Sequence, residues 1–94
     1  MFNEQTPAHI DQTSDGKFFI NFTNGKVKNP DFIVRPVKET KKVIEIFGRY
    51  WHKAEEEAEL TERYAEVGYK CLVIWEEEVY NGTYHEKLEQ FLGS

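Results

Sequence analysis

The stretch PDFIVRPVKETKKVIEIFGRYWH, residues 30–52, decides the fold of this 94-residue chain. Two apolar, β-branched runs, 32–35 and 42–47, predict antiparallel strands joined by a turn around residues 36–40. If that turn centres on Lys38, paired residues have numbers that sum to 76. Asp31 then lies directly opposite Glu45, on the same face of the sheet.

This pairing would bring two carboxylates together. Directly opposed residues of an antiparallel pair have Cβ atoms about 4.5–5.5 Å apart, and like charges at that distance destabilise a sheet. A positive group between Asp31 and Glu45 is therefore expected. Mg²⁺ is suited to the place because it binds carboxylate and carbonyl oxygens.

The flanking sequence supplies the other expected elements. Residues 17–23 alternate apolar and polar and predict the first strand of a meander, ended by a tight Asn24-Gly25 turn. Residues 53–67 predict a helix that stops at Gly68 and lies on the sheet through small residues, namely Ala54, Ala58, Thr61 and Ala65. Residues 69–75 form an almost continuous apolar run, which is typical of a strand buried on both faces. Thr83 and Glu86 predict a capping box that opens a last helix.

Together these elements predict one small α/β domain with a mixed sheet of about four strands. An antiparallel meander is followed by a right-handed crossover helix and one parallel strand. The Glu76-Glu77-Glu78 run after that strand is expected to form a solvated acidic turn.

Composition limits the classes of function. The net charge of −5 argues against a free-standing, high-affinity nucleic-acid binder. The charge is uneven, however, because residues 1–53 carry nine basic and six acidic residues while residues 54–94 carry three and eleven. Cys71 is the sole cysteine, so no structural zinc site is expected. No apolar run is long enough for a membrane helix, and we expect an intracellular, cytoplasmic protein.

The joint pattern resembles a known family. Pro30-Asp31-Phe32, Gly48-x-Tyr50-Trp51-His52 and Gly68-Tyr69-Lys70-x-Leu72-Val73-Ile74-Trp75-Glu76 are similar to segments of very-short-patch-repair mismatch endonucleases. They resemble still more the catalytic domain of phage homing endonucleases of the EDxHD type, within the PD-(D/E)XK nuclease superfamily. The resemblance covers about residues 29–77. Phe47 departs from the superfamily pattern, which has a lysine at that position.

The resemblance implies roles for individual residues. Asp31 matches a metal-binding aspartate, Ile46 matches a residue whose carbonyl binds the metal, and His52 matches a histidine beside the scissile phosphate. With Glu45, the first two would hold Mg²⁺, or Mn²⁺ in its place. Glu57 falls near a helix acid of the family, with a register that can slip by one residue. His52 would be the general base or acid.

Double-stranded DNA is the expected partner. Arg49, Tyr50, Trp51 and Lys53 are the candidate DNA contacts, and core packing or simple solvation is the alternative for each. We expect the catalytic part of an intron-encoded homing endonuclease, acting in a bacterial host or phage-infected cell, with its DNA-binding region elsewhere in a longer chain or in a homodimer. A mismatch-type nicking repair enzyme and an inactive nuclease-fold module that binds nucleic acid are the alternatives.

Overall fold

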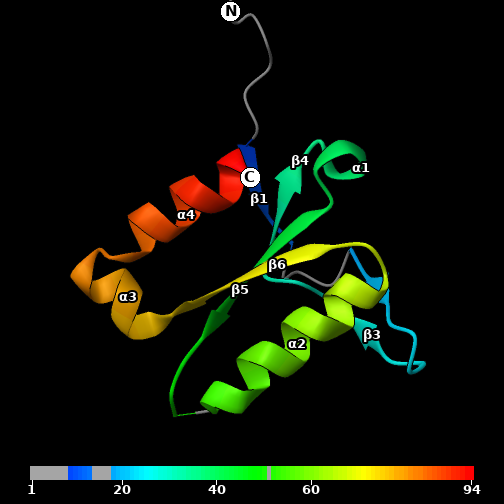
Figure 1. The fold of residues 1–94 in the computed structure, drawn as a ribbon, viewed down its shortest axis with the longest axis horizontal. Coiled ribbons are helices and arrows are strands. Elements are labelled where there is room, and N and C mark those ends of the chain that lie inside the picture. Colours follow the sequence, from blue (N-terminus) through cyan, green and yellow to red (C-terminus); the bar gives the residue numbers. More distant parts are fainter. Residues whose placement is uncertain (1–8, 14–17, 51) are drawn as a thin grey trace, which may run out of the picture.

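A mixed four-stranded sheet forms the centre of the molecule (Figure 1). The computed structural model describes residues 9–13, 18–50 and 52–94. Among these residues the sheet has the order β1 (His9–Gln12), β4 (Phe32–Arg35), β5 (Lys42–Phe47) and β6 (Lys70–Trp75). β5 and β6 are parallel and the other neighbours are antiparallel, which confirms a small α/β domain with one parallel pair.

The predicted register between the two central strands is confirmed. Phe32 pairs with Ile44 and Ile33 pairs with Val43, as expected for a turn centred on Lys38. The turn itself is a single helical turn, α1 (Val37–Thr40), that Thr40 fastens to β4 by donating from its hydroxyl to the Val34 carbonyl at 2.7 Å. The next position in this register, beyond the last ladder pair, is Asp31 opposite Glu45.

The prediction for the first strand is wrong. The segment predicted as that strand, residues 17–23, contributes only β2 (Ile20–Asn21), which pairs with β3 (Val27–Lys28) in a separate two-stranded hairpin. The sheet's first strand is instead β1, whose sequence is polar. β1 lies at the edge of the sheet, where charged residues are common and a clear apolar period is not required.

Helix α2 (Ala54–Glu66) follows the predicted span but presents a different face to the sheet. Ala54, Ala58 and Ala65 are exposed, so the expected small-residue contact is wrong. Leu60 and the fully buried Tyr64 pack on the sheet instead. The bulky residues decide the orientation because burying them removes more apolar area from water than burying alanines. Gly68 follows the helix in the left-handed region, and the backbone hydrogen bonds from Gly68 to Ala65 and from Tyr69 to Tyr64 complete its C-terminal cap.

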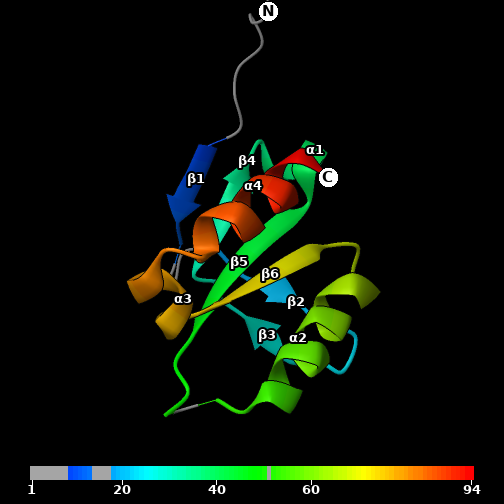
Figure 2. The ribbon, with the colours of Figure 1, turned by 60° about the vertical axis from the view of Figure 1, so that its left-hand side comes forward.

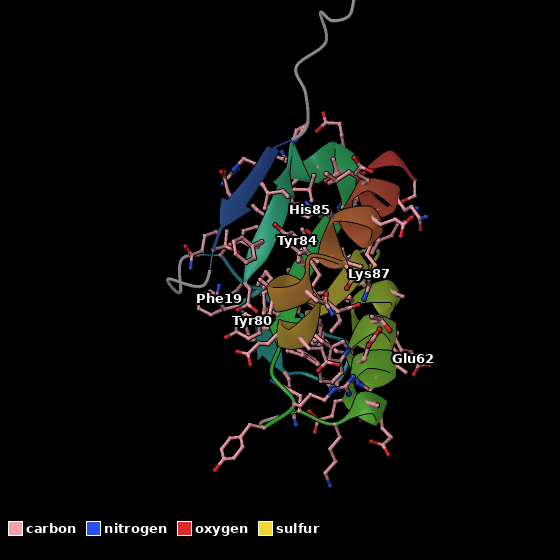
Figure 3. The ribbon with its side chains drawn as sticks, turned by 90° about the vertical axis from the view of Figure 1, so that its left-hand side faces the viewer. Phe19, Glu62, Tyr80, Tyr84, His85 and Lys87 are labelled. Atoms are coloured by element: carbon pink, nitrogen blue, oxygen red, sulfur yellow. The ribbon has the colours of Figure 1, made fainter. Side chains whose placement is uncertain are left out.

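Two short helices cover the other face of the sheet (Figures 1 and 2). The expected acidic turn is the first turn of α3 (Glu76–Asn81), where Glu78 accepts a hydrogen bond from the Trp75 N–H at 2.9 Å. α4 (Tyr84–Gly93) begins without the predicted capping box, because the Thr83 hydroxyl donates to Asn81 Oδ1. The side view in Figure 3 places Tyr84, His85 and Lys87 on this side of the molecule. Lys87 links α4 to α3 through an ion pair with Glu78 at 2.9 Å.

The sheet is therefore covered on both faces, as the apolar run of β6 predicted. The α2 face carries α2 and the β2–β3 hairpin, over Ile33, Val43, Val73 and Trp75. The α4 face carries α4, over Val34, Ile44 and Ile74. Within the described residues no helix has the length and apolar character required to cross a membrane.

Candidate active site on the α2 face

Asp31 and Glu45 meet at the point where β4 ends and β5 continues. The Asp31 Oδ2 atom accepts a hydrogen bond from the Ile46 N–H at 2.9 Å. The N–H and C=O groups of one strand residue point to the same edge, so the Ile46 carbonyl also faces the Asp31 side of β5. The pairing register thus places two carboxylates and one backbone carbonyl side by side.

Glu45 is a buried carboxylate, with only 2 % of its surface exposed. Its Oε2 accepts a hydrogen bond from the Tyr64 hydroxyl at 2.6 Å, and its Oε1 lies 3.5 Å from the Lys28 ammonium. Burial raises the pKa of Glu45, and the neighbouring Asp31 raises it further, while Tyr64 and Lys28 act in the opposite direction. The net effect is a raised pKa, so Glu45 keeps its proton to a higher pH than a carboxyl group in water does.

Lys28 is thus a positive group beside the carboxylate pair. The sequence predicted such a group and suggested Mg²⁺. The structure shows that the Lys28 ammonium, from β3, forms an ion pair with Glu45. A metal remains compatible with the donor set, since Mg²⁺ is commonly held by one or two carboxylates with water completing its shell. Asp31, Glu45 and the Ile46 carbonyl are of that kind. Among the described residues no cluster of three or more His, Cys, Asp or Glu side chains forms a larger metal site.

His52 reaches the same face by a tight return of the chain after β5. Its N–H donates to the Gly48 carbonyl at 2.9 Å, and its ring stacks on Phe47 with centroids 3.9 Å apart and planes 10° from parallel. Phe47 and Glu45 are two residues apart on one strand, so their side chains share a face of the sheet. The Phe47 ring is therefore the surface against which the imidazole packs.

Gly48 lies close to the side chain of Glu76. A Cβ atom at this position would lie 2.8 Å from Glu76 Oε1. The Glu76 carboxylate, at the start of α3, therefore packs directly against the turn that carries His52.

Glu56, rather than Glu57, is the acid beside His52. The His52 Nδ1 lies 2.9 Å from Glu56 Oε1, one helical turn along the chain. Glu57 instead accepts a hydrogen bond from the Trp75 indole N–H at 2.7 Å. The helix acid in contact with His52 is therefore one residue before the predicted Glu57.

The predicted DNA contacts differ in their partners and exposure. Arg49 makes a two-point ion pair with Glu77, at 2.9 and 3.0 Å, and its guanidinium lies over the Trp75 ring. The ion pair raises the pKa of Arg49 and lowers that of Glu77. Tyr50 is 87 % exposed and Lys53 is exposed just before α2. The prediction for Trp51 falls outside the described residues.

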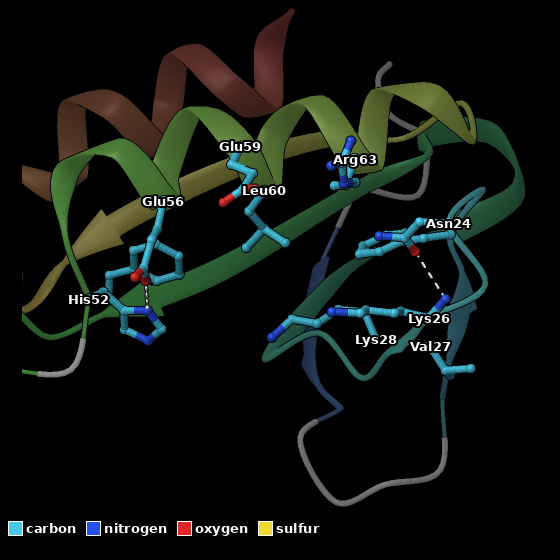
Figure 4. A pocket seen from close by; sticks show the side chains of 11 residues that line it. Asn24, Lys26, Val27, Lys28, His52, Glu56, Glu59, Leu60 and Arg63 are labelled. Atoms are coloured by element: carbon cyan, nitrogen blue, oxygen red, sulfur yellow. Dashed lines mark hydrogen bonds and ion pairs between the residues drawn. The ribbon is translucent and has the colours of Figure 1, made fainter.

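A cleft of about 440 Å³ opens between the β2–β3 hairpin and α2 (Figure 4). His52 and Glu56 stand at one end and Lys28 extends toward them from the hairpin. The lining residues are Phe22, Asn24, Lys26, Val27, Lys28, Phe47, His52, Glu56, Glu59, Leu60 and Arg63. Lys28 both lines this cleft and pairs with Glu45, so it connects the carboxylate pair to the open space.

Sequence reasoning missed three residues of this site. The spacing of Glu56 four residues after His52 on a predicted helix was a usable signal for their contact. Tyr64 could have been found from the bulky stripe Glu57, Leu60 and Tyr64, which has the period of one helix face. Lys28 carried no local signal, because its partner Glu45 lies on a different strand.

Comparison with known proteins gives no family assignment. No protein-family description, no curated protein and no solved structure matches this chain.

Proposed function

We propose that this domain is a Mg²⁺-dependent DNA endonuclease with a PD-(D/E)XK-like fold, the catalytic part of a homing endonuclease of the EDxHD type. The observation that carries the proposal is the juxtaposition of Asp31 and Glu45 on neighbouring strands, with Lys28 leading from Glu45 to a cleft that contains His52. Two acids and a carbonyl can hold a metal ion, and an imidazole can transfer a proton, which together can promote hydrolysis of a phosphodiester.

Each residue has a separate task in this proposal. Asp31, Glu45 and the Ile46 carbonyl would hold Mg²⁺, and the chemistry that this ion supplies when bound is neutralisation of phosphate charge and polarisation of water. Asp31 is already oriented by the Ile46 N–H. To hold the ion, Glu45 would give up its contact with Lys28, and the ammonium would then be free to turn toward the cleft.

His52 handles the proton. As general base, its Nε2 takes a proton from water while the water oxygen bonds to phosphorus and the bond from phosphorus to the leaving deoxyribose oxygen breaks. Glu56 accepts from the Nδ1–H, fixing the tautomer and stabilising the imidazolium that results. The same ring can then return the proton to the leaving oxygen.

One observation favours an inactive nucleic-acid-binding module as the second candidate. Glu45 is satisfied by Tyr64 and Lys28 without any metal. These contacts can have a purely structural role, in which Glu45 binds no metal. A mismatch-type nicking enzyme, the other alternative, would share the active chemistry and differ in its preferred DNA.

The test compares the native chain with Asp31→Asn and with Glu62→Gln, a control on the outer side of α2 (Figure 3). Supercoiled plasmid is incubated at low salt with Mg²⁺ or EDTA, and Mn²⁺ binding is measured by calorimetry. We expect cleavage that requires Mg²⁺, is lost in Asp31→Asn and persists in Glu62→Gln. Mn²⁺ binding unaffected by Asp31→Asn, or absent from the native chain, would overturn the metal site. Metal binding without cleavage would favour the inactive module.

A further inference from the structure

Three cationic side chains converge on the cleft although the chain as a whole is acidic. Lys26 and Lys28 come from the hairpin, and Arg63 comes from α2. None of them belongs to the basic residues that the sequence singled out as DNA contacts. The cleft floor is apolar and partly aromatic, formed by Phe22, Phe47 and Leu60.

The hairpin that carries the two lysines is fastened to the rest of the fold. The Lys26 N–H donates to Asn24 Oδ1 at 2.9 Å, and the Phe22 N–H donates to the Lys26 carbonyl at 2.8 Å. Thr23 donates from its hydroxyl to Glu66 at the end of α2 at 2.7 Å, and Phe22 packs edge-on against Tyr64 with centroids 5.0 Å apart. The last two contacts tie the hairpin to α2, the other wall of the cleft.

Charges are segregated across the cleft. Lys26 and Lys28 occupy the hairpin wall, whereas Glu56 and Glu59 lie on the first half of α2 (Figure 4). Glu56 is engaged by His52, and Arg63, which pairs with Glu66 at 3.5 Å, adds positive charge at the far end of the helix wall. An anion would thus be held on the hairpin side, with the imidazole at its end.

We propose that this cleft binds the phosphate backbone of a nucleic-acid strand, with Lys26, Lys28 and Arg63 as its cationic contacts. The inference rests on the proposed function and adds the path of the substrate to it. Lys28 lies beside Glu45 in this structure, and its move to a bound phosphate would link binding of the strand to the carboxylate pair. The aromatic floor suits the sugar and base next to the bound phosphate.

Lys26→Gln is the cleanest test because Lys26, unlike Lys28, has no contact with Glu45 among the described ion pairs. Lys38→Gln, exposed on α1, is the matched control with the same charge change. Binding of a fluorescent 20-base-pair duplex is measured by anisotropy in EDTA, where no cleavage occurs, across a series of salt concentrations. One lost phosphate contact is expected to weaken binding about threefold and to reduce the salt slope by about one, with no such change in Lys38→Gln.

Nuclear magnetic resonance with inorganic pyrophosphate provides a second measurement that does not depend on duplex affinity. We expect shifts concentrated at the backbone amides of Lys26, Lys28 and Arg63 and at the His52 ring. Equal effects of Lys26→Gln and Lys38→Gln, or shifts spread evenly over the surface, would overturn the proposal. Cleavage that depends on Asp31 but not on Lys26 would overturn this inference and leave the nuclease standing. Phosphate binding in the cleft without any cleavage would support this inference and count against the proposed nuclease.

Discussion

The two faces of the sheet are built from different chemistry. The α4 face is mainly apolar, with Ile44 and Ile74 beneath Leu88 and Phe91. Its buried cation, Lys42, donates hydrogen bonds to backbone carbonyls at the end of α4. The α2 face is equally well covered but encloses the Glu45 carboxylate and the Tyr64 hydroxyl. An apolar face gains stability from every buried side chain, whereas a buried carboxylate costs free energy unless its partners compensate. If the proposed function is correct, the α2 face bears the cost of a buried carboxylate for its chemistry, whereas the α4 face mainly contributes stability.

The first prediction concerns the imidazole, and its expected effect on activity is the largest. His52→Ala should reduce Mg²⁺-dependent cleavage about 10²–10⁴-fold, because removing a general acid or base costs that much. The free energy of unfolding should change by only about 1 kcal/mol, since the half-exposed ring loses mainly its stacking on Phe47. Single-turnover cleavage and urea unfolding measure the two quantities.

His85→Ala provides the matched control on the other face. His85 is exposed on α4 and its ring lies against Tyr84. Cleavage should be unchanged in this variant. If His52→Ala retained native cleavage, the assignment of the α2 face as the reactive one would fail.

The second prediction concerns the α4 face, where a substitution should affect stability and leave metal binding unchanged. Ile74 is 4 % exposed on the α4 face, and Ile74→Ala should lower the free energy of unfolding by about 2–5 kcal/mol through lost burial and a residual cavity. Mn²⁺ affinity of the folded protein should be retained, because Ile74 points away from Asp31 and Glu45. Urea unfolding and calorimetry test this separation, and a parallel loss of metal binding would show that the two faces are not independent.

Much of the fold follows from the sequence because its central elements have strong local patterns. β4, β5, β6 and α2 were predicted within a residue of their observed ends, and the β4–β5 register followed from the position of the turn. The first strand was misplaced because an edge strand such as β1 needs no apolar alternation. The apolar residues of segment 17–23 have a different role, because Ile20 packs into the core from the β2–β3 hairpin.

The candidate site was predictable only where it depends on register. The sequence predicts that Asp31 lies opposite Glu45, because antiparallel pairing fixes which residues oppose each other. The contacts of Glu45 with Tyr64 and Lys28 join separate elements, and no local pattern encodes them. The face of α2 was misjudged because a stripe of alanines and a stripe of bulky residues have the same period, and burial selects the latter.

The last prediction separates stability from function at a single residue, Glu45. Because burial raises its pKa in the folded state, Glu45 binds its proton more tightly there than in the unfolded chain. Stability is therefore fully present below the unfolded pKa of about 4.3 and is lost as pH rises through the folded value. Glu45→Gln cannot ionise and can still accept a hydrogen bond from Tyr64. The variant should therefore be more stable than the native chain at pH 8, by a margin that shrinks as pH falls toward 4.

Mn²⁺ affinity should fall at least about tenfold in the same variant, because the metal loses a charged ligand. Urea unfolding across this pH range and calorimetry provide the two readouts. A variant less stable at every pH would show that the pair with Lys28 outweighs the cost of burial, and the α2 face would then be a structural ion pair.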